Sequence, residues 1–189
     1  VARLVELLGV STETVRRDLE DLENNNMLTR VHGGAVSVKK RYRFEDMDVR
    51  GTSNMELKEQ IARKALEYVK DGDTIAIDSG STASLFAMAL KARNFDSLSV
   101  ITYSSEVFSI LSECGNYRIT LLGGEYLPKE KLFYGFLTHE AMQKLYFSKA
   151  FVVPSALSVE DGAHDFIRET YENQCMLIGP VSYTHLTLP

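Results

Sequence analysis

The 189-residue sequence contains no tryptophan, only two cysteines and only four prolines. The cysteines, Cys114 and Cys175, lack the spacing of metal ligands, so we expect reduced thiols in a cytoplasmic protein. No run approaches the ~18 consecutive apolar residues of a membrane-spanning helix, and we expect no membrane partner. Apolar residues make up 44% of the chain and charged residues 25%, which is typical of a globular protein with room for a small and a medium domain.

Motifs for catalysis and for metal binding are missing as well. The sequence has no Walker A loop, no G-x-S-x-G turn, no zinc-ligand spacing and no histidine cluster. His139 and His164 stand alone, as structural or surface histidines usually do. We therefore expect no cofactor, no metal and no enzyme activity.

Acidic residues outnumber basic ones, but not evenly along the chain. The net charge of −5 arises entirely after residue 50, because residues 1–50 hold nine basic and nine acidic side chains. Between Arg30 and Arg43 there are five basic residues and no acidic one. Taken alone, such a run would be a solvated linker. Next to a DNA-reading helix it favours contacts with phosphates.

Such a helix is predicted near the start of the chain. Residues 2–8 favour a short helix, Gly9 and Val10 a turn, and residues 11–23 a second helix that Ser11 would cap. Apolar residues at i, i+4 and i+7 form one buried stripe and leave adjacent arginines outside. Arginine grips phosphates and pairs bidentately with guanine. The DNA-contacting residues expected here are Ser11, Thr12, Thr14, Arg16 and Arg17.

A β-hairpin is expected directly after this helix. Residues 28–32 and 35–38 have β character and flank Gly33-Gly34. A hairpin in this position is the wing of a winged helix-turn-helix. We expect Arg30, His32, Lys39 and Lys40 near the DNA backbone or minor groove, although His32 would also suit a plain polar hairpin.

From Met55 onward the pattern changes to helices alternating with strands. After a polar linker over 39–54, with residues 51–54 as its most flexible part, this alternation predicts a parallel α/β sheet. The expected strands are 74–77, 98–103, 117–122 and 149–153, and the expected helices begin near residues 55, 83, 105 and 139.

Ligands of such sheets bind at the carboxyl ends of the strands. The sharpest candidate is the loop 78–82, whose small hydroxyl residues open a helix and would suit a phosphate. By itself it would also fit a simple capped turn. Asp78 could act as a base or orient a sugar hydroxyl, and loop 161–165 could close over a ligand or be a plain turn. The residues expected to bind an anionic effector are Asp78, Ser79, Gly80, Ser81, Thr82, Thr102, Tyr103, Ser104, Gly123 and Gly124.

These motifs resemble those of one family. Residues 10–19 and His32-Gly33-Gly34-Ala35 look like the DNA-binding domain of DeoR-type bacterial regulators, and residues 71–74, 78–82, 100–102 and 121–124 look like their sensor domain. The resemblance implies a winged helix-turn-helix joined to a domain related to ribose-5-phosphate isomerase. It implies a repressor that binds double-stranded operator DNA, is released by a phosphorylated sugar, and forms a homo-oligomer, a dimer or tetramer.

The chain departs from the family pattern at several places. Asn26 stands for a glycine, Tyr103 for an asparagine, and residues 152–155 for a glycine-containing segment. We expect the first winged-domain helix to precede Val1, and residues 181–189 to be a non-native tail, or else a strand. The expected division is a winged domain over 1–38, a linker over 39–54, a sensor domain over 55–180 and the tail.

Two other functions fit the same residues. One is a sugar-phosphate isomerase-like enzyme with an appended winged domain. The other is a DNA-binding activator that uses the second domain only to form oligomers.

Overall fold

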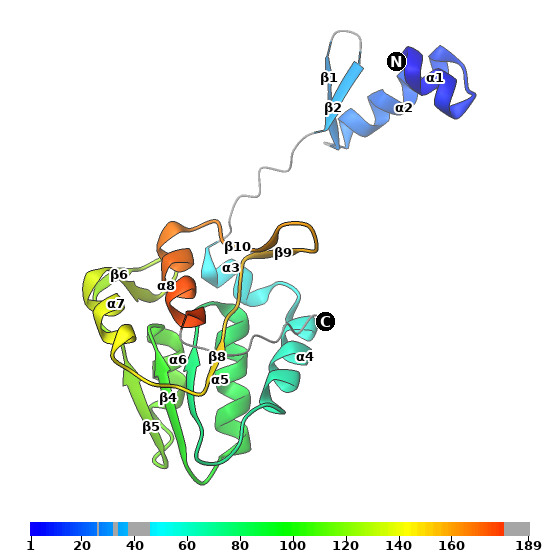
Figure 1. Cartoon of the computed structure of the whole chain (residues 1–189). Coiled ribbons are helices and arrows are strands. Elements are labelled where there is room, and N and C mark those ends of the chain that lie inside the picture. The colour runs from blue at the N-terminus through cyan, green and yellow to red at the C-terminus, as the bar shows by residue number, and fades with distance from the viewer. Residues whose placement is uncertain (26, 32–33, 38–45, 180–189) are drawn as a thin grey trace. The chain divides into compact units, whose positions relative to one another are not determined.

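The computed structural model describes residues 1–25, 27–31, 34–37 and 46–179, which form two compact units, 1–44 and 45–189. Figure 1 shows the helices and strands of each unit. His32, Lys39, Lys40 and the tail over 181–189, for which we made predictions, lie outside the described residues.

The first unit contains the predicted helix, turn, helix and hairpin. Helix α1 (Ala2–Leu8) ends at Gly9, whose left-handed φ of 64° suits glycine. Helix α2 (Thr12–Asn24) buries Val15 and Leu19 on one side, as its apolar spacing predicts. Strands β1 (Leu28–Val31) and β2 (Gly34–Ser37) then pair antiparallel.

The second unit is built on a four-stranded parallel sheet with the order β5-β4-β3-β8. These strands are β3 (Thr74–Ile77), β4 (Leu98–Thr102), β5 (Tyr117–Leu121) and β8 (Lys149–Phe151). All four were predicted, β3 with the same bounds and the other three with C-terminal ends that differ by one or two residues. Because the strands are parallel, their carboxyl ends lie at one edge of the sheet, where we expect a ligand.

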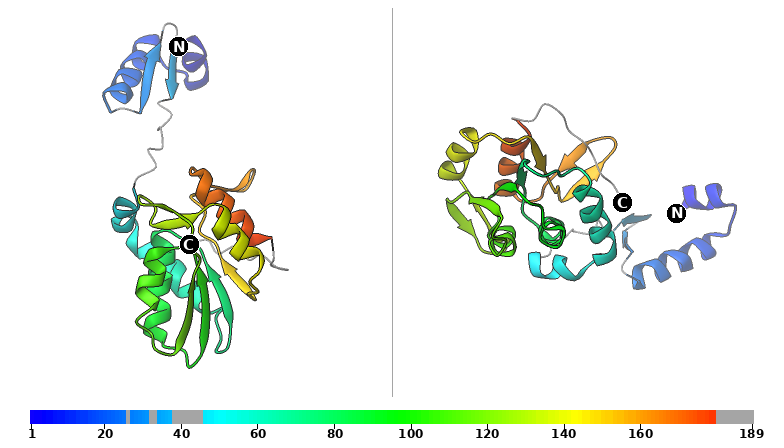
Figure 2. Two further views of the ribbon diagram at one scale, coloured as in Figure 1. Left: turned by 90° about the vertical axis from the view of Figure 1, so that its left-hand side faces the viewer. Right: turned by 90° about the horizontal axis from the view of Figure 1, so that it is seen from below.

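Helices cover both faces of this sheet (Figure 2). Helices α4 (Met55–Leu66), α5 (Ser81–Arg93) and α6 (Ser105–Leu111) pack on the face that carries Ile75 and Val100. Helices α7 (Phe136–Gln143) and α8 (Arg168–Ile178) pack on the face that carries Ala76 and Ile101. The near-continuous apolar strands are explained by this burial on both faces.

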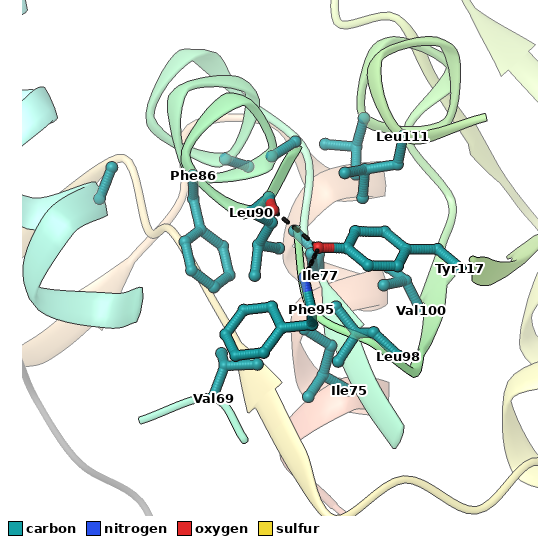
Figure 3. Close-up of a cluster of buried hydrophobic side chains, with 14 residues drawn as sticks. Val69, Ile75, Ile77, Phe86, Leu90, Phe95, Leu98, Val100, Leu111 and Tyr117 are labelled. Atoms are coloured by element: carbon teal, nitrogen blue, oxygen red, sulfur yellow. Dashed lines mark hydrogen bonds between the residues drawn. The ribbon is translucent and has the colours of Figure 1, made fainter. Parts of the chain in front are cut away.

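Tyr117 lies in the apolar core between the sheet and helices α4, α5 and α6, and its hydroxyl is hydrogen-bonded there. Figure 3 shows the Tyr117 hydroxyl between two backbone groups: it donates to the Leu90 carbonyl at 2.7 Å and accepts from the Phe95 N–H at 2.9 Å. These bonds join the start of β5 to the end of α5 and to the segment that follows it, so the polar end of a buried ring is satisfied by the backbone.

Several elements of the second unit were not predicted. They are α3 (Met47–Thr52), the hairpin of β6 (Glu125–Leu127) with β7 (Leu132–Tyr134), the hairpin of β9 (Ala156–Ser158) with β10 (Gly162–His164), and α8.

The prediction that 39–54 is all linker was wrong. Residues 47–52 form α3, and Met47 is buried, with 3% of its surface exposed. The apolar side chain of Met47 packs into the second unit, so this part of the segment belongs to that unit.

Candidate functional site

The candidate DNA-binding surface is the exposed side of α2. The Ser11 hydroxyl accepts a hydrogen bond from the Thr14 N–H at 3.1 Å and lies 2.8 Å from the Thr14 hydroxyl, so both groups hold the helix start. Thr12, Arg16 and Arg17 are exposed, whereas Val15 and Leu19 are buried. Their side chains are free to approach a major groove, which is the arrangement predicted from the spacing.

The hairpin is tied to this helix. The Glu23 carboxylate accepts a hydrogen bond from the backbone N–H of Arg30 at 2.7 Å, which fixes the start of the hairpin against the end of α2. The Arg30 side chain is left exposed. Contact of Arg30 with DNA remains a prediction.

At the edge of the parallel sheet, Asp78 is the centre of a hydrogen-bond network. Its carboxylate is fully buried and accepts from the Ser79 N–H at 2.7 Å, the Val153 N–H at 2.8 Å, the Gln174 side chain at 3.0 Å and the Tyr103 hydroxyl. Burial raises its pKa to about 6, although the four hydrogen bonds act in the opposite direction. Since every acceptor site is in use, Asp78 holds the loops together more readily than it contacts a ligand.

The loop after β4 is also turned inward. Thr102 donates to the Ile77 carbonyl at 2.8 Å, and the Ser104 hydroxyl accepts from the Val107 N–H at 3.2 Å, capping α6. Tyr103 is fully buried, and burial raises the pKa of its hydroxyl well above the usual value. These three residues were expected to touch the effector. Their geometry suits support of the loop, and direct contact remains a prediction.

The open part of the predicted anion site is the start of α5. Gly80 precedes the helix with a φ of 113°, a conformation that side chains rarely adopt. Ser79 is buried, whereas Ser81 and Thr82 are half-buried and lie in the first helical turn. Hydroxyl groups beside the N–H groups of a first turn are suited to bind phosphate oxygens.

The two glycines of the third loop differ in their surroundings. A Cβ on Gly124 would lie 2.3 Å from the Thr138 hydroxyl and 2.4 Å from the Tyr134 carbonyl, whereas a Cβ on Gly123 would meet nothing within 4 Å. The Gly123 carbonyl accepts from the Thr138 hydroxyl at 3.0 Å. Gly124 is therefore required by packing between this loop and the start of α7.

Sequence reasoning missed the contribution of α8. The Gln174 side chain donates to Asp78, and it also lies 3.2 Å from Asp165 and 3.3 Å from the Val153 carbonyl. Asp165 in turn accepts from the Ser155 hydroxyl at 2.9 Å. The only signal in the sequence was a glutamine within an amphipathic helix, which does not by itself indicate a buried partner.

Neither a metal site nor a membrane span is found in the part of the chain that the structure describes. No three histidine, cysteine or acidic side chains there are grouped to hold a metal ion. Every described helix is too short or too polar to cross a bilayer.

Comparison with known proteins assigns both parts of the chain. Residues 1–41 match the model of the DeoR-like helix-turn-helix domain, and residues 53–181 match that of the DeoR C terminal sensor domain.

Curated relatives extend over most of the chain. A lactose phosphotransferase system repressor of Streptococcus mutans is 36% identical, covering 94% of this chain and 70% of the relative. Proteins of the same name from Lactococcus lactis and Staphylococcus epidermidis are each 37% identical, covering 84% and 92% of this chain and 62% and 69% of their own lengths.

A solved structure of ribose 5-phosphate isomerase A from Methanocaldococcus jannaschii is 28% identical, with a TM-score of 0.32. It covers 37% of this chain and 32% of its own. A similarity of this extent does not establish a common fold. The family assignment rests instead on the two domain matches and the curated relatives: the chain belongs to the DeoR family of regulators, with a helix-turn-helix domain followed by a sensor domain.

Proposed function

We propose that this protein represses an operon of sugar metabolism by binding operator DNA, and that a phosphorylated sugar bound to the second unit releases it. The observation that carries the proposal is the presence of a helix-turn-helix domain and a sensor domain in one chain whose relatives are named lactose phosphotransferase system repressors. A repressor that acts on operator DNA works in the bacterial cytoplasm, and two-fold operators suit a dimer.

The DNA-binding surface that we propose consists of the exposed side of α2 and the hairpin. Arg16 and Arg17 would contact bases or phosphates, while the capped start of the helix sets their position. Arg30, His32, Lys39 and Lys40 would add contacts to the backbone or minor groove.

The effector site proposed for the second unit is the start of α5. Ser81, Thr82 and the N–H groups of the first turn would bind the phosphate, and Asp78 would hold the loop through its network. A sugar phosphate fits because it combines an anion with hydroxyl groups. The relatives are named for a lactose phosphotransferase system. Because lactose contains galactose, we take a galactose phosphate, galactose 6-phosphate, as the first candidate to test.

A gel-shift titration tests the whole proposal. The probe is DNA selected by the protein from random sequence, with galactose 6-phosphate, glucose 6-phosphate, fructose 6-phosphate and ribose 5-phosphate as effectors. We expect specific binding that one of these sugars weakens. A protein that binds no operator, or that ignores all four sugars, contradicts the corresponding half of the proposal.

A charge placed at the start of α5 tests the site. Ser81→Asp puts a carboxylate where we place the phosphate, yet an acidic residue in a first turn does not weaken a helix. We expect operator binding to persist and release by the sugar to be lost. Ser109→Asp, which adds the same charge on the exposed side of α6, is the matched control.

A further inference from the structure

Ion pairs connect helix α3 and the preceding residue, Asp46, to the turn between β6 and β7. Arg50 pairs with Glu130, Asp48 accepts from Lys131 at 2.7 Å, and Asp46 lies 3.3 Å from Lys129. We call α3 with Asp46, together with the turn 128–131, the latch. Residues of α3 are more than 75 positions away from the turn in sequence, so these contacts depend entirely on the tertiary structure.

The middle of the latch is buried. Glu130 is 5% exposed, and desolvation raises the pKa of its carboxyl while the Arg50 guanidinium lowers it. Met47 is also buried, and its N–H lies 3.4 Å from the Lys129 carbonyl. A half-buried pair of this kind is sensitive to the loss of either partner, because the remaining group then loses that opposite charge.

The same turn is bonded on its other side to the loop after β4. The N–H and the hydroxyl of Ser105 both donate to the Lys131 carbonyl at 2.9 Å. The Phe133 N–H donates to the Tyr103 carbonyl at 2.8 Å, and Ser104 forms a β-bridge with Leu132. Lys131 has a φ of 53°, an uncommon conformation for a lysine, which these contacts hold in place.

A second connection runs to the start of α5. The Lys131 ammonium lies 3.7 Å from Glu106 in α6, and Glu106 accepts from the Ser84 hydroxyl at 3.0 Å. Ser84 lies in the first turns of α5, and its N–H donates to the Gly80 carbonyl at 3.0 Å. The latch is thus joined directly to the loop after β4 and, through Glu106 and Ser84, to the start of α5.

Among the described residues, helix α3 is also the first element of the second unit, and it follows the residues that join it in sequence to the helix-turn-helix domain. We propose that the latch couples the effector site to that junction, so that sugar phosphate at the strand ends changes the pairing of α3 with the turn. This inference rests on the proposed function. It requires that the effector favour one of two arrangements of the latch, since a ligand shifts an equilibrium only through its difference in affinity.

Removing the buried charge tests the coupling. Glu130→Gln keeps the shape of the side chain and deletes its charge. In the gel shift with the most effective of the four sugar phosphates, we expect operator affinity without sugar to stay within twofold of wild type. The loss of affinity caused by the sugar, about 5- to 150-fold in allosteric proteins, should shrink at least fivefold. An unchanged response overturns the proposal.

Glu113→Gln is the matched control, because it deletes a charge paired with Lys91 between neighbouring parts of the same unit but outside the latch. It should leave the response to sugar intact. Asp48→Asn, which removes an exposed partner of Lys131, provides a second latch variant if Glu130→Gln does not fold. It should reduce the response in the same direction.

Hydrogen exchange without any sugar separates this inference from the proposed function. In Glu130→Gln, the amides of residues 47–52 and of residues 102–106 should both exchange faster than in wild type. Faster exchange confined to 47–52 would show that the turn does not connect α3 to the site, and would overturn the coupling. A wild-type protein that ignores all four sugar phosphates would instead contradict the proposed effector.

Discussion

At the scale of single residues, Asp78 combines two opposing effects. Burial removes its carboxylate from water, while four donors from separate segments stabilise the charge. Its partners come from the loop after β3, from the loop after β4, from the segment after β8 and from α8. One side chain therefore determines how four parts of the site meet.

The titration of Asp78 makes folding stability depend on pH. Its pKa is about 6 in the folded chain and 3.8 in the unfolded chain, so the folded state binds the proton more tightly. The associated stabilisation, about 3 kcal/mol, is complete below pH 4 and is lost as the pH rises through 6. Urea unfolding of wild type and Asp78→Asn at pH 4 and 7 should show this loss in wild type alone. Parallel profiles would contradict it.

The two neighbouring glycines of the third loop provide a prediction with its own control. Gly124→Ala should destabilise the second unit by about 1–3 kcal/mol, because its Cβ must displace the Tyr134 backbone. Gly123→Ala has open space and should change stability by less than about 0.5 kcal/mol. Thermal or urea unfolding compares the two. Equal effects would show that the close approach at Gly124 does not constrain the loop.

At the scale of elements, the residues of α2 that stabilise the helix differ from those that we propose to contact DNA. Val15 and Leu19 face inward and Ser11 caps the start, while Thr12, Arg16 and Arg17 are exposed. Substitutions on the exposed side should therefore change DNA binding without unfolding the helix.

Arg17→Ala is the direct test of the reading helix. If Arg17 contacts a base, operator binding should weaken by about 1–3 kcal/mol and discriminate less against the mutated base pair. Lys144→Ala, which also removes one exposed positive charge but lies in the second unit, should have no such effect. Gel shifts at one fixed salt concentration give the comparison. Equal affinity of Arg17→Ala and wild type would remove this residue from the interface.

The bonds of Tyr117 show how one side chain joins two elements. Tyr117→Phe keeps the ring in the core but leaves the Phe95 N–H without the hydroxyl that it donates to. We expect a loss of about 1–3 kcal/mol in the free energy of unfolding. Tyr146→Phe, at a position 85% exposed, should be neutral. Similar urea midpoints for both variants would argue against the bridging role.

At the scale of the whole molecule, the family assignment describes a regulator that joins a DNA-binding unit to a sensor unit. A ligand that binds only the folded sensor must stabilise it by mass action. Galactose 6-phosphate at 100 times its dissociation constant should raise the stability of the second unit by about 2.7 kcal/mol. A thermal-shift assay measures this, with galactose as the control that lacks the phosphate. An equal shift with galactose would contradict recognition of the phosphate.

The elements that could be predicted are those with a strong local pattern. The apolar strands β3 and β4 and the capped helix α2 were predicted because their spacing and capping residues are visible within a few positions. Three-residue strands such as β6 and β7 are too short to show a period, and the six residues of α3 include only two apolar side chains, Met47 and Val49. These elements form because of what they pack against.

The sequence alone determined the order of the two domains, the capped helix α2 and the loops that end the parallel strands, because capping, periodicity and turn residues act locally. Only the tertiary structure decided which polar residues those loops turn inward. Gln174 reaches Asp78 from 96 positions away, and Arg50 reaches Glu130 from 80 positions away. The physical reason is that a buried polar group must find a partner wherever the fold brings one, and that choice depends on three-dimensional packing.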